Sequence, residues 1–146
     1  MGLKRMKKLN LVSYCGLYCE DCFNYTGSIA DLARDLRKEL RKSNFDKVVE
    51  ALPFKEFDNY SECYECLGGL ENLRCEGCRD GSRAKFCHIA QCAQKNEYQG
   101  CWECGEFETC KEFEFLKPLH KDANLKNLRK IKEQGVEGFL NGKRYW

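Results

Sequence analysis

Residues 75–92 read CEGCRDGSRAKFCHIAQC, a stretch with the spacing C-x2-C-x8-C-x4-C whose cysteines are Cys75, Cys78, Cys87 and Cys92. A C-x2-C pair lets both sulfurs turn toward one ion, and four thiolates complete the tetrahedral shell that structural zinc prefers. We therefore expect these four residues to form a local zinc site. Because the binding free energy of such a site becomes folding free energy, we also expect it to nucleate the fold.

The chain has twelve cysteines, and the eight outside this stretch form an opening triplet, a pair and a closing triplet: Cys15, Cys19 and Cys22; Cys63 and Cys66; Cys101, Cys104 and Cys110. Each triplet is one thiolate short of a four-ligand site, and the pair has two thiolates to supply. Twelve cysteines therefore suffice for three zinc ions. A second interpretation of the pair is equally open, since cysteines at helical spacing are often small buried apolar residues.

The composition favours reduced thiols over disulfides. Setting the cysteines aside, the 42% hydrophobic content leaves a modest core for a 146-residue chain, a shortfall that metal sites would offset. The apolar stretch after the basic amino terminus, Leu9 to Val12, is too short for a signal peptide, and no segment has the roughly 18 apolar residues of a membrane helix. We therefore expect a cytoplasmic protein, whose thiols stay available to metal.

Charge gives little indication of a partner. The 25 basic and 23 acidic residues nearly balance, so that the formal net charge of +2 provides no bulk attraction to nucleic acid. Two basic runs, Lys4 to Lys8 and Lys126 to Lys132, are better explained as solvated surface than as a nucleic-acid site. We expect a protein or small-molecule partner, with no membrane contact.

The hydrophobic pattern predicts a mostly helical, irregular, metal-stabilised single domain over residues 1–146, with short helices and little or no β-sheet. We expect a helical part at 28–58, a cysteine-rich middle at 61–116 and a carboxy-terminal helix at 122–140. In the helical part, one apolar face combines Ile29, Leu32, Leu36 and Leu40.

Single residues predict where two of the helices end. A second helix from Phe45 should end or kink near Pro53, since proline disfavours a helix at the residue before it. In the last helix, Leu125, Leu128 and Ile131 should point inward, with Gly135 as a C-cap. Beyond it, we expect Val136, Phe139 and Leu140 to return to the core.

Iron is the alternative to zinc. The opening triplet has the C-x3-C-x2-C spacing of radical-SAM clusters, but the 124 residues after Cys22 (146 minus 22) lack repeated strand–helix units. An iron–sulfur cluster or thiol redox chemistry is therefore the second hypothesis, and zinc is favoured because no proline adjoins a cysteine as in ferredoxin-like runs. We see no catalytic set and expect a non-enzymatic module. The two histidines, His88 and His120, are expected to be solvated or capping.

The ordered motifs CGLYCEDC (15–22), CEGC (75–78), CHIxxCA (87–93) and CxxCxEFxxC (101–110) resemble a prokaryotic cysteine-rich family, domain of unknown function 3795. The segments NLKNL (124–128) and GVEGFL (135–140) also resemble its closing helix. Some members are described as zinc-finger-like, so the resemblance implies metal binding and no particular activity. The chain departs from the family pattern in two places, since Thr109 replaces a common proline and the Cys63/Cys66 pair is additional.

Overall fold

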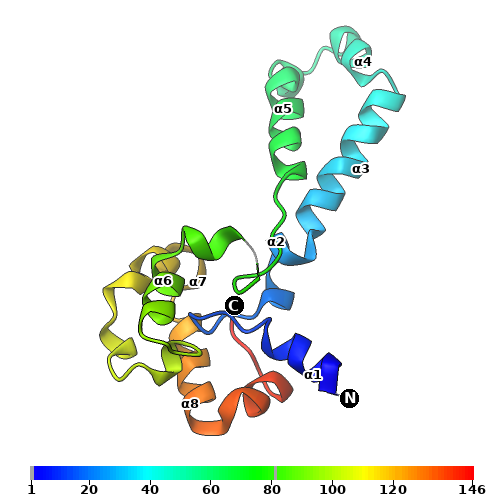
Figure 1. The fold of residues 1–146 in the computed structure, drawn as a ribbon. Coiled ribbons are helices and arrows are strands. Elements are labelled where there is room, and N and C mark those ends of the chain that lie inside the picture. The colour runs from blue at the N-terminus through cyan, green and yellow to red at the C-terminus, as the bar shows by residue number, and fades with distance from the viewer. Residues whose placement is uncertain (1, 81) are drawn as a thin grey trace. The chain divides into compact units, whose positions relative to one another are not determined.

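A computed structural model describes residues 2–80 and 82–146, which form α-helices joined by turns and short 3-10 helices (Figure 1). The α-helices are α1 (Gly2–Leu9), α2 (Phe23–Thr26), α3 (Ser28–Lys42), α4 (Phe45–Ala51), α5 (Tyr60–Glu71), α6 (His88–Lys95), α7 (Lys117–His120) and α8 (Ala123–Asn141). The 3-10 helices are η1 (Cys19–Asp21), η2 (Lys55–Phe57), η3 (Ser82–Lys85), η4 (Cys101–Glu103), η5 (Phe107–Thr109) and η6 (Lys111–Leu116). Within the described residues, β-structure is limited to one antiparallel bridge between Val12 and Tyr18, which confirms the predicted helical class.

Contacts divide the chain into two compact units. Unit 1 comprises Met1–Tyr25 and Cys75–Trp146, and unit 2 is the intervening segment Thr26–Arg74. Helix α5, which the sequence assigns to the cysteine-rich middle, belongs to unit 2. The single-domain assignment stays a prediction. None of the helices in the described part of the chain combines the length and the apolarity that a membrane span requires.

Unit 2 is built on α3 and α5, which run side by side and are connected through α4 (Figure 1). Helix α4 ends at Ala51 because Leu52, the residue before Pro53, is extended, as predicted. The apolar face predicted for α3 is not buried. Leu32 and Leu36 are 72% and 49% exposed.

The buried side of α3 combines the small residues Ala30 and Ala33 with arginines that contact α5. The Arg37 guanidinium lies 4.5 Å from the centre of the Tyr64 ring and forms an ion pair with Glu71 at 2.6 Å. Arg41 donates a hydrogen bond to the Tyr64 hydroxyl at 2.8 Å. Arginine side chains that stack on an aromatic ring provide both apolar and polar contact.

The core of unit 1 joins the first segment of the chain to α8. Buried Leu11 and Val12 pack with Ile131 and Phe139 in one cluster, and Leu128 packs with Phe107 in a second. Ile131, Leu128 and Phe139 therefore face inward, as predicted. Gly135 interrupts α8 with φ +74°, a conformation that suits glycine, so the helix kinks there and continues to Asn141.

The carboxy-terminal tail folds back onto unit 1. The Asn127 side chain donates to the Tyr145 carbonyl at 2.8 Å and accepts from the Tyr145 N–H at 2.9 Å. Arg144 forms a two-pronged ion pair with Asp21 at 2.8 and 3.1 Å. These bonds hold Trp146 with its ring 4.6 Å from that of His120, at nearly a right angle.

Candidate thiol site

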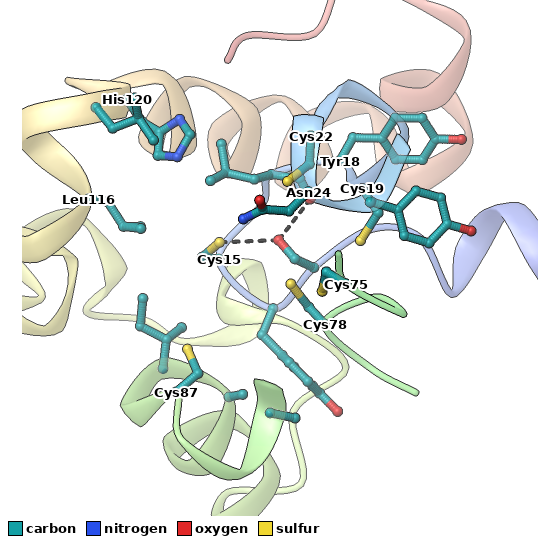
Figure 2. A pocket seen from close by; sticks show the side chains of 18 of the residues that line it. Cys15, Tyr18, Cys19, Cys22, Asn24, Cys75, Cys78, Cys87, Leu116 and His120 are labelled. Carbon is teal, nitrogen blue, oxygen red and sulfur yellow. Dashed lines mark hydrogen bonds between the residues drawn. The ribbon is translucent and has the colours of Figure 1, made fainter. Parts of the chain in front are cut away.

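Unit 1 contains a cavity of about 730 Å³, here called the thiol cavity, with six cysteines in its wall: Cys15, Cys19, Cys22, Cys75, Cys78 and Cys87. Figure 2 shows their sulfurs around one space, with those of Cys19, Cys75 and Cys78 close together. Three segments supply these cysteines, namely the loop and turn at 15–22, the loop at 75–78 and the residue before α6. Tertiary folding therefore gathers thiols that are far apart in the sequence.

The C-x2-C spacing has a direct local cause in Cys19 and Cys22. These residues begin and follow η1, and the Cys22 N–H donates to the Cys19 carbonyl at 2.9 Å. A 3-10 helix has 3.0 residues per turn, so side chains three apart project from the same side. Cys101 and Cys104 repeat this turn around η4, with the corresponding bond at 3.1 Å.

The Cys75–Cys78 pair uses a glycine turn. Gly77 has φ +109°, which L-residues rarely adopt. In this conformation the Gly77 N–H donates to the Cys75 sulfur at 3.4 Å. The Cys75 N–H in turn donates to the Asn24 carbonyl at 2.9 Å, which attaches the loop to α2.

Cys19 and Cys78 form a neighbouring thiol pair. Interaction with the Cys78 thiol, with help from the Cys78 backbone N–H and the Arg79 charge, lowers the pKa of Cys19 to about 7. Interaction with Cys19 and burial raise the pKa of Cys78. Arg79 is held in place, since its Nε donates to the Val12 carbonyl at 2.7 Å. One thiolate is therefore stabilised at this point.

Cys15 lies in a less polar part of the wall, where burial raises the pKa of its thiol. The Ser13 hydroxyl donates to the Leu17 carbonyl at 2.7 Å and lies 3.1 Å from the Cys15 sulfur. Because the hydroxyl hydrogen is used in the first bond, the Cys15 S–H is the donor in the second. Cys15 is therefore a protonated thiol near neutral pH.

A second group of cysteines gathers around Cys101. Burial, with smaller electrostatic contributions from neighbouring cysteines, raises the pKa of the Cys101 thiol to about 12, and these neighbours are Cys15, Cys110, Cys104 and Cys92. We call Cys92, Cys101, Cys104 and Cys110 the closing group. It combines the predicted closing triplet with the last member of the predicted local foursome.

Within residues 2–80 and 82–146, no three His, Cys, Asp or Glu side chains are arranged to hold one metal ion. Of the predicted local foursome, Cys75, Cys78 and Cys87 line the thiol cavity, whereas Cys92 is exposed on α6. The opening triplet lines the same cavity. Cys63 and Cys66 lie on α5 of unit 2 and are exposed, so the interpretation of this pair as buried apolar residues is wrong.

Two candidate functional residues could not be recognised from the sequence, because neither belongs to a motif with a characteristic spacing. His120 and Asn24 line the thiol cavity and are only 7% and 9% exposed. The His120 Nδ1 and the Asn24 Oδ1 have no hydrogen-bond partner in the described chain. The expectation that His120 is solvated or capping is wrong, because α7 and the tail that carries Trp146 bury it. Burial lowers the pKa of His120, so the ring is neutral.

The fold and the site define a helical, cysteine-rich protein whose thiols gather mainly in one unit. The chain belongs to the family described as Protein of unknown function (DUF3795), whose sequence profile matches residues 11–115. The match contains all twelve cysteines and the whole of unit 2, and it ends before α8. It confirms the family resemblance seen in the cysteine motifs. No curated protein and no solved structure matches the chain significantly.

Proposed function

We propose that the protein binds zinc through Cys19, Cys22, Cys75 and Cys78, in a structural site and without enzymatic activity. The observation that carries this proposal is the position of Cys19 and Cys78 in one packed cluster, where their sulfurs lie close together beside that of Cys75 (Figure 2). One sulfur from each C-x2-C turn therefore lies near the other. Four protein thiolates fill a tetrahedral zinc and leave no position for a reactive water. This set takes Cys75 and Cys78 from the foursome predicted by the sequence and replaces the other two.

The backbone supports thiolates at this site. The Gly77 N–H donates to the Cys75 sulfur, and the Cys78 backbone helps to lower the pKa of Cys19. Donors of this kind stabilise the charged form of a thiol, which is the form that binds metal. The adjacent Arg79 offsets part of the negative charge that four thiolates bring. Zinc–sulfur bonds of about 2.3 Å require the Cys22 and Cys75 side chains to rotate toward the ion.

Such a site would stabilise unit 1 at the point where the chain leaves it and returns to it. Cys22 and Cys75 are 53 positions apart (75 minus 22), and the segment between them contains unit 2. A cross-link that closes a long loop removes conformational entropy from the unfolded chain. A structural zinc contributes on the order of 10 kcal/mol of binding free energy to the folded state.

The closing group is the second zinc site of the proposal. Its pair Cys101 and Cys104 has the same 3-10 turn as Cys19 and Cys22, and the charges of Cys110 and Cys92 act on Cys101. Four thiolates again satisfy tetrahedral zinc. Two ions in unit 1 then use eight of the ten cysteines of that unit.

The test is metal analysis of protein purified without oxygen or added metal. We expect two zinc ions per chain, no iron, and a colourless solution. Cys78→Ser should remove one ion, whereas Cys63→Ser, an exposed position on α5, should remove none. Equal zinc content in the two variants would overturn the assignment. Iron with visible absorption would instead establish the iron–sulfur alternative.

A dithiol function is the second candidate, because the Cys19 and Cys78 thiols already contact each other. In thiol–disulfide exchange, the Cys19 thiolate attacks a disulfide and displaces one thiol, and Cys78 then displaces the second, leaving a Cys19–Cys78 disulfide. Metal-free Cys78→Ser protein should then trap a mixed disulfide at Cys19 when given oxidised glutathione. Absence of this adduct by mass spectrometry would exclude the exchange reaction.

A further inference from the structure

Two unpaired polar atoms lie inside the thiol cavity. The His120 Nδ1 and the Asn24 Oδ1 lack a partner in the described chain, although both side chains are more than nine-tenths buried. Figure 2 shows both side chains directed into the same part of the cavity. A buried polar atom without a hydrogen bond costs folding free energy, and a ligand that pairs with it recovers that cost.

The remaining wall of the cavity is suited to an apolar body. Aromatic and aliphatic side chains are exposed on it, with Phe86 82%, Phe115 61% and Leu119 63% exposed. Exposed large apolar groups that gather around a hollow are typical of binding sites. The volume of about 730 Å³ lies in the range of small-molecule pockets, which is roughly 300–1,000 Å³.

The lining also limits the charge of the ligand. Among the lining residues that the structure describes, Glu112 is the only carboxylate and no lysine or arginine is present. The Glu112 side chain is 49% exposed. An anionic ligand would therefore leave water without a cationic partner among these residues, and it would also face the Cys19 thiolate, which is costly. These features disfavour an anion and are compatible with a neutral molecule.

We propose that the thiol cavity binds a neutral small molecule with an aromatic or aliphatic body and a primary amide head that pairs with Asn24 and His120. A primary amide carries N–H donors and a carbonyl acceptor on adjacent atoms. The donors satisfy the Asn24 Oδ1, and the amide can either donate to the His120 Nδ1 or accept from it, depending on the tautomer. The body then contacts Phe86, Phe115 and Leu119. This ligand site is additional to the proposed zinc sites, whose ligands do not include His120 or Asn24.

Naphthamide is the probe, and binding is measured on the full chain by saturation-transfer NMR and calorimetric titration. N,N-dimethylnaphthamide lacks the N–H donors, and naphthalene lacks the head. We expect N,N-dimethylnaphthamide to bind about tenfold more weakly than naphthamide, the value of one good hydrogen bond, and naphthalene, which loses the bonds to both Asn24 and His120, roughly a hundredfold more weakly. Equal affinities for all three, or no binding of naphthamide up to its solubility, would overturn the proposal.

Variants locate the site. Asn24→Leu and His120→Phe preserve size and should each weaken naphthamide binding about tenfold. The matched control is His88→Phe, because His88 also lines the cavity but is 76% exposed and should leave the affinity unchanged. Equal losses in His88→Phe and His120→Phe would refute the role of His120. The comparison of analogues on the unaltered protein decides the matter even if a variant fails to fold.

Discussion

Gly77→Ala is the substitution that best isolates the turn between Cys75 and Cys78. A Cβ on Gly77 would lie 3.8 Å from the nearest atom outside the turn, on the Tyr25 ring, which is an ordinary van der Waals contact. Space is therefore not the obstacle. The obstacle is φ +109°, a backbone conformation in which an L-residue is strained.

Because only the backbone conformation opposes Gly77→Ala, backbone strain sets the size of the loss in stability. A residue forced into a sparsely populated backbone region costs about 1–3 kcal/mol. If the turn instead relaxes, the Gly77 N–H withdraws from the Cys75 sulfur, and the same energy is lost from zinc binding. That loss corresponds to a roughly 5- to 150-fold lower affinity. We expect Gly77→Ala to show one of these losses or a division between them.

Gly105→Ala is the matched control, since Gly105 directly follows a C-x2-C pair but has no positive φ and nothing within 4 Å of its added Cβ. Both tryptophans, Trp102 and Trp146, lie in unit 1, so fluorescence in urea reports the unfolding of that unit alone. Competition with a chromophoric chelator measures the zinc affinity. If Gly77→Ala and Gly105→Ala give the same midpoint and the same affinity, the argument from the Gly77 backbone is refuted.

The other predictions concern His120, α3 and the tail. Burial lowers the pKa of His120 in the folded protein below 6.5, its value in the unfolded chain. Between these two pKa values the unfolded chain binds a proton that the folded chain does not, so the free energy of unfolding falls as the pH drops through this window. Urea titrations should show this fall for the native protein and less of it for His120→Phe. Leu36→Gln should change stability by less than about 0.5 kcal/mol because Leu36 is half exposed, whereas Ala33→Leu should cost about 1–3 kcal/mol by overpacking a buried site. Equal circular-dichroism melts of the two variants would contradict this difference. Arg144→Met should release the tail from Asp21 and raise the accessibility of Trp146 to an acrylamide quencher, and unchanged quenching would contradict the role of this ion pair.

The residues that act locally were predictable from the sequence. Pro53 ends α4 through a clash with its own neighbour, and Gly135 interrupts α8 through its own backbone freedom. The inward positions of Leu128 and Ile131 follow from helical periodicity. The same periodicity was misleading at Leu32, because it shows that an apolar stripe exists and cannot show whether a partner covers it. On α3, arginines that contact an aromatic ring supply the helix contact instead.

The candidate site was predictable only in part, for a related reason. C-x2-C spacing dictates a turn that aligns two sulfurs, as in Cys19 and Cys22. The contact between Cys19 and Cys78 joins residues 59 positions apart (78 minus 19), which depends on the packing of the whole of unit 1. The burial of His120 depends on a tail held by Arg144, far along the chain. Spacing motifs contain neither kind of information.

The bond between the Asn24 carbonyl and the Cys75 N–H has a consequence for how this family can vary. Asn24 and Cys75 flank the segment that forms unit 2, and a hydrogen bond joins them. Within this segment, residues near its two ends are joined by the ion pair of Asp31 with Arg74 at 2.6 Å. A segment that starts and finishes at neighbouring points can lengthen, shorten or be exchanged during evolution while the rest of the protein keeps its structure. Relatives are therefore expected to differ most in residues 26–74 and least around the thiols.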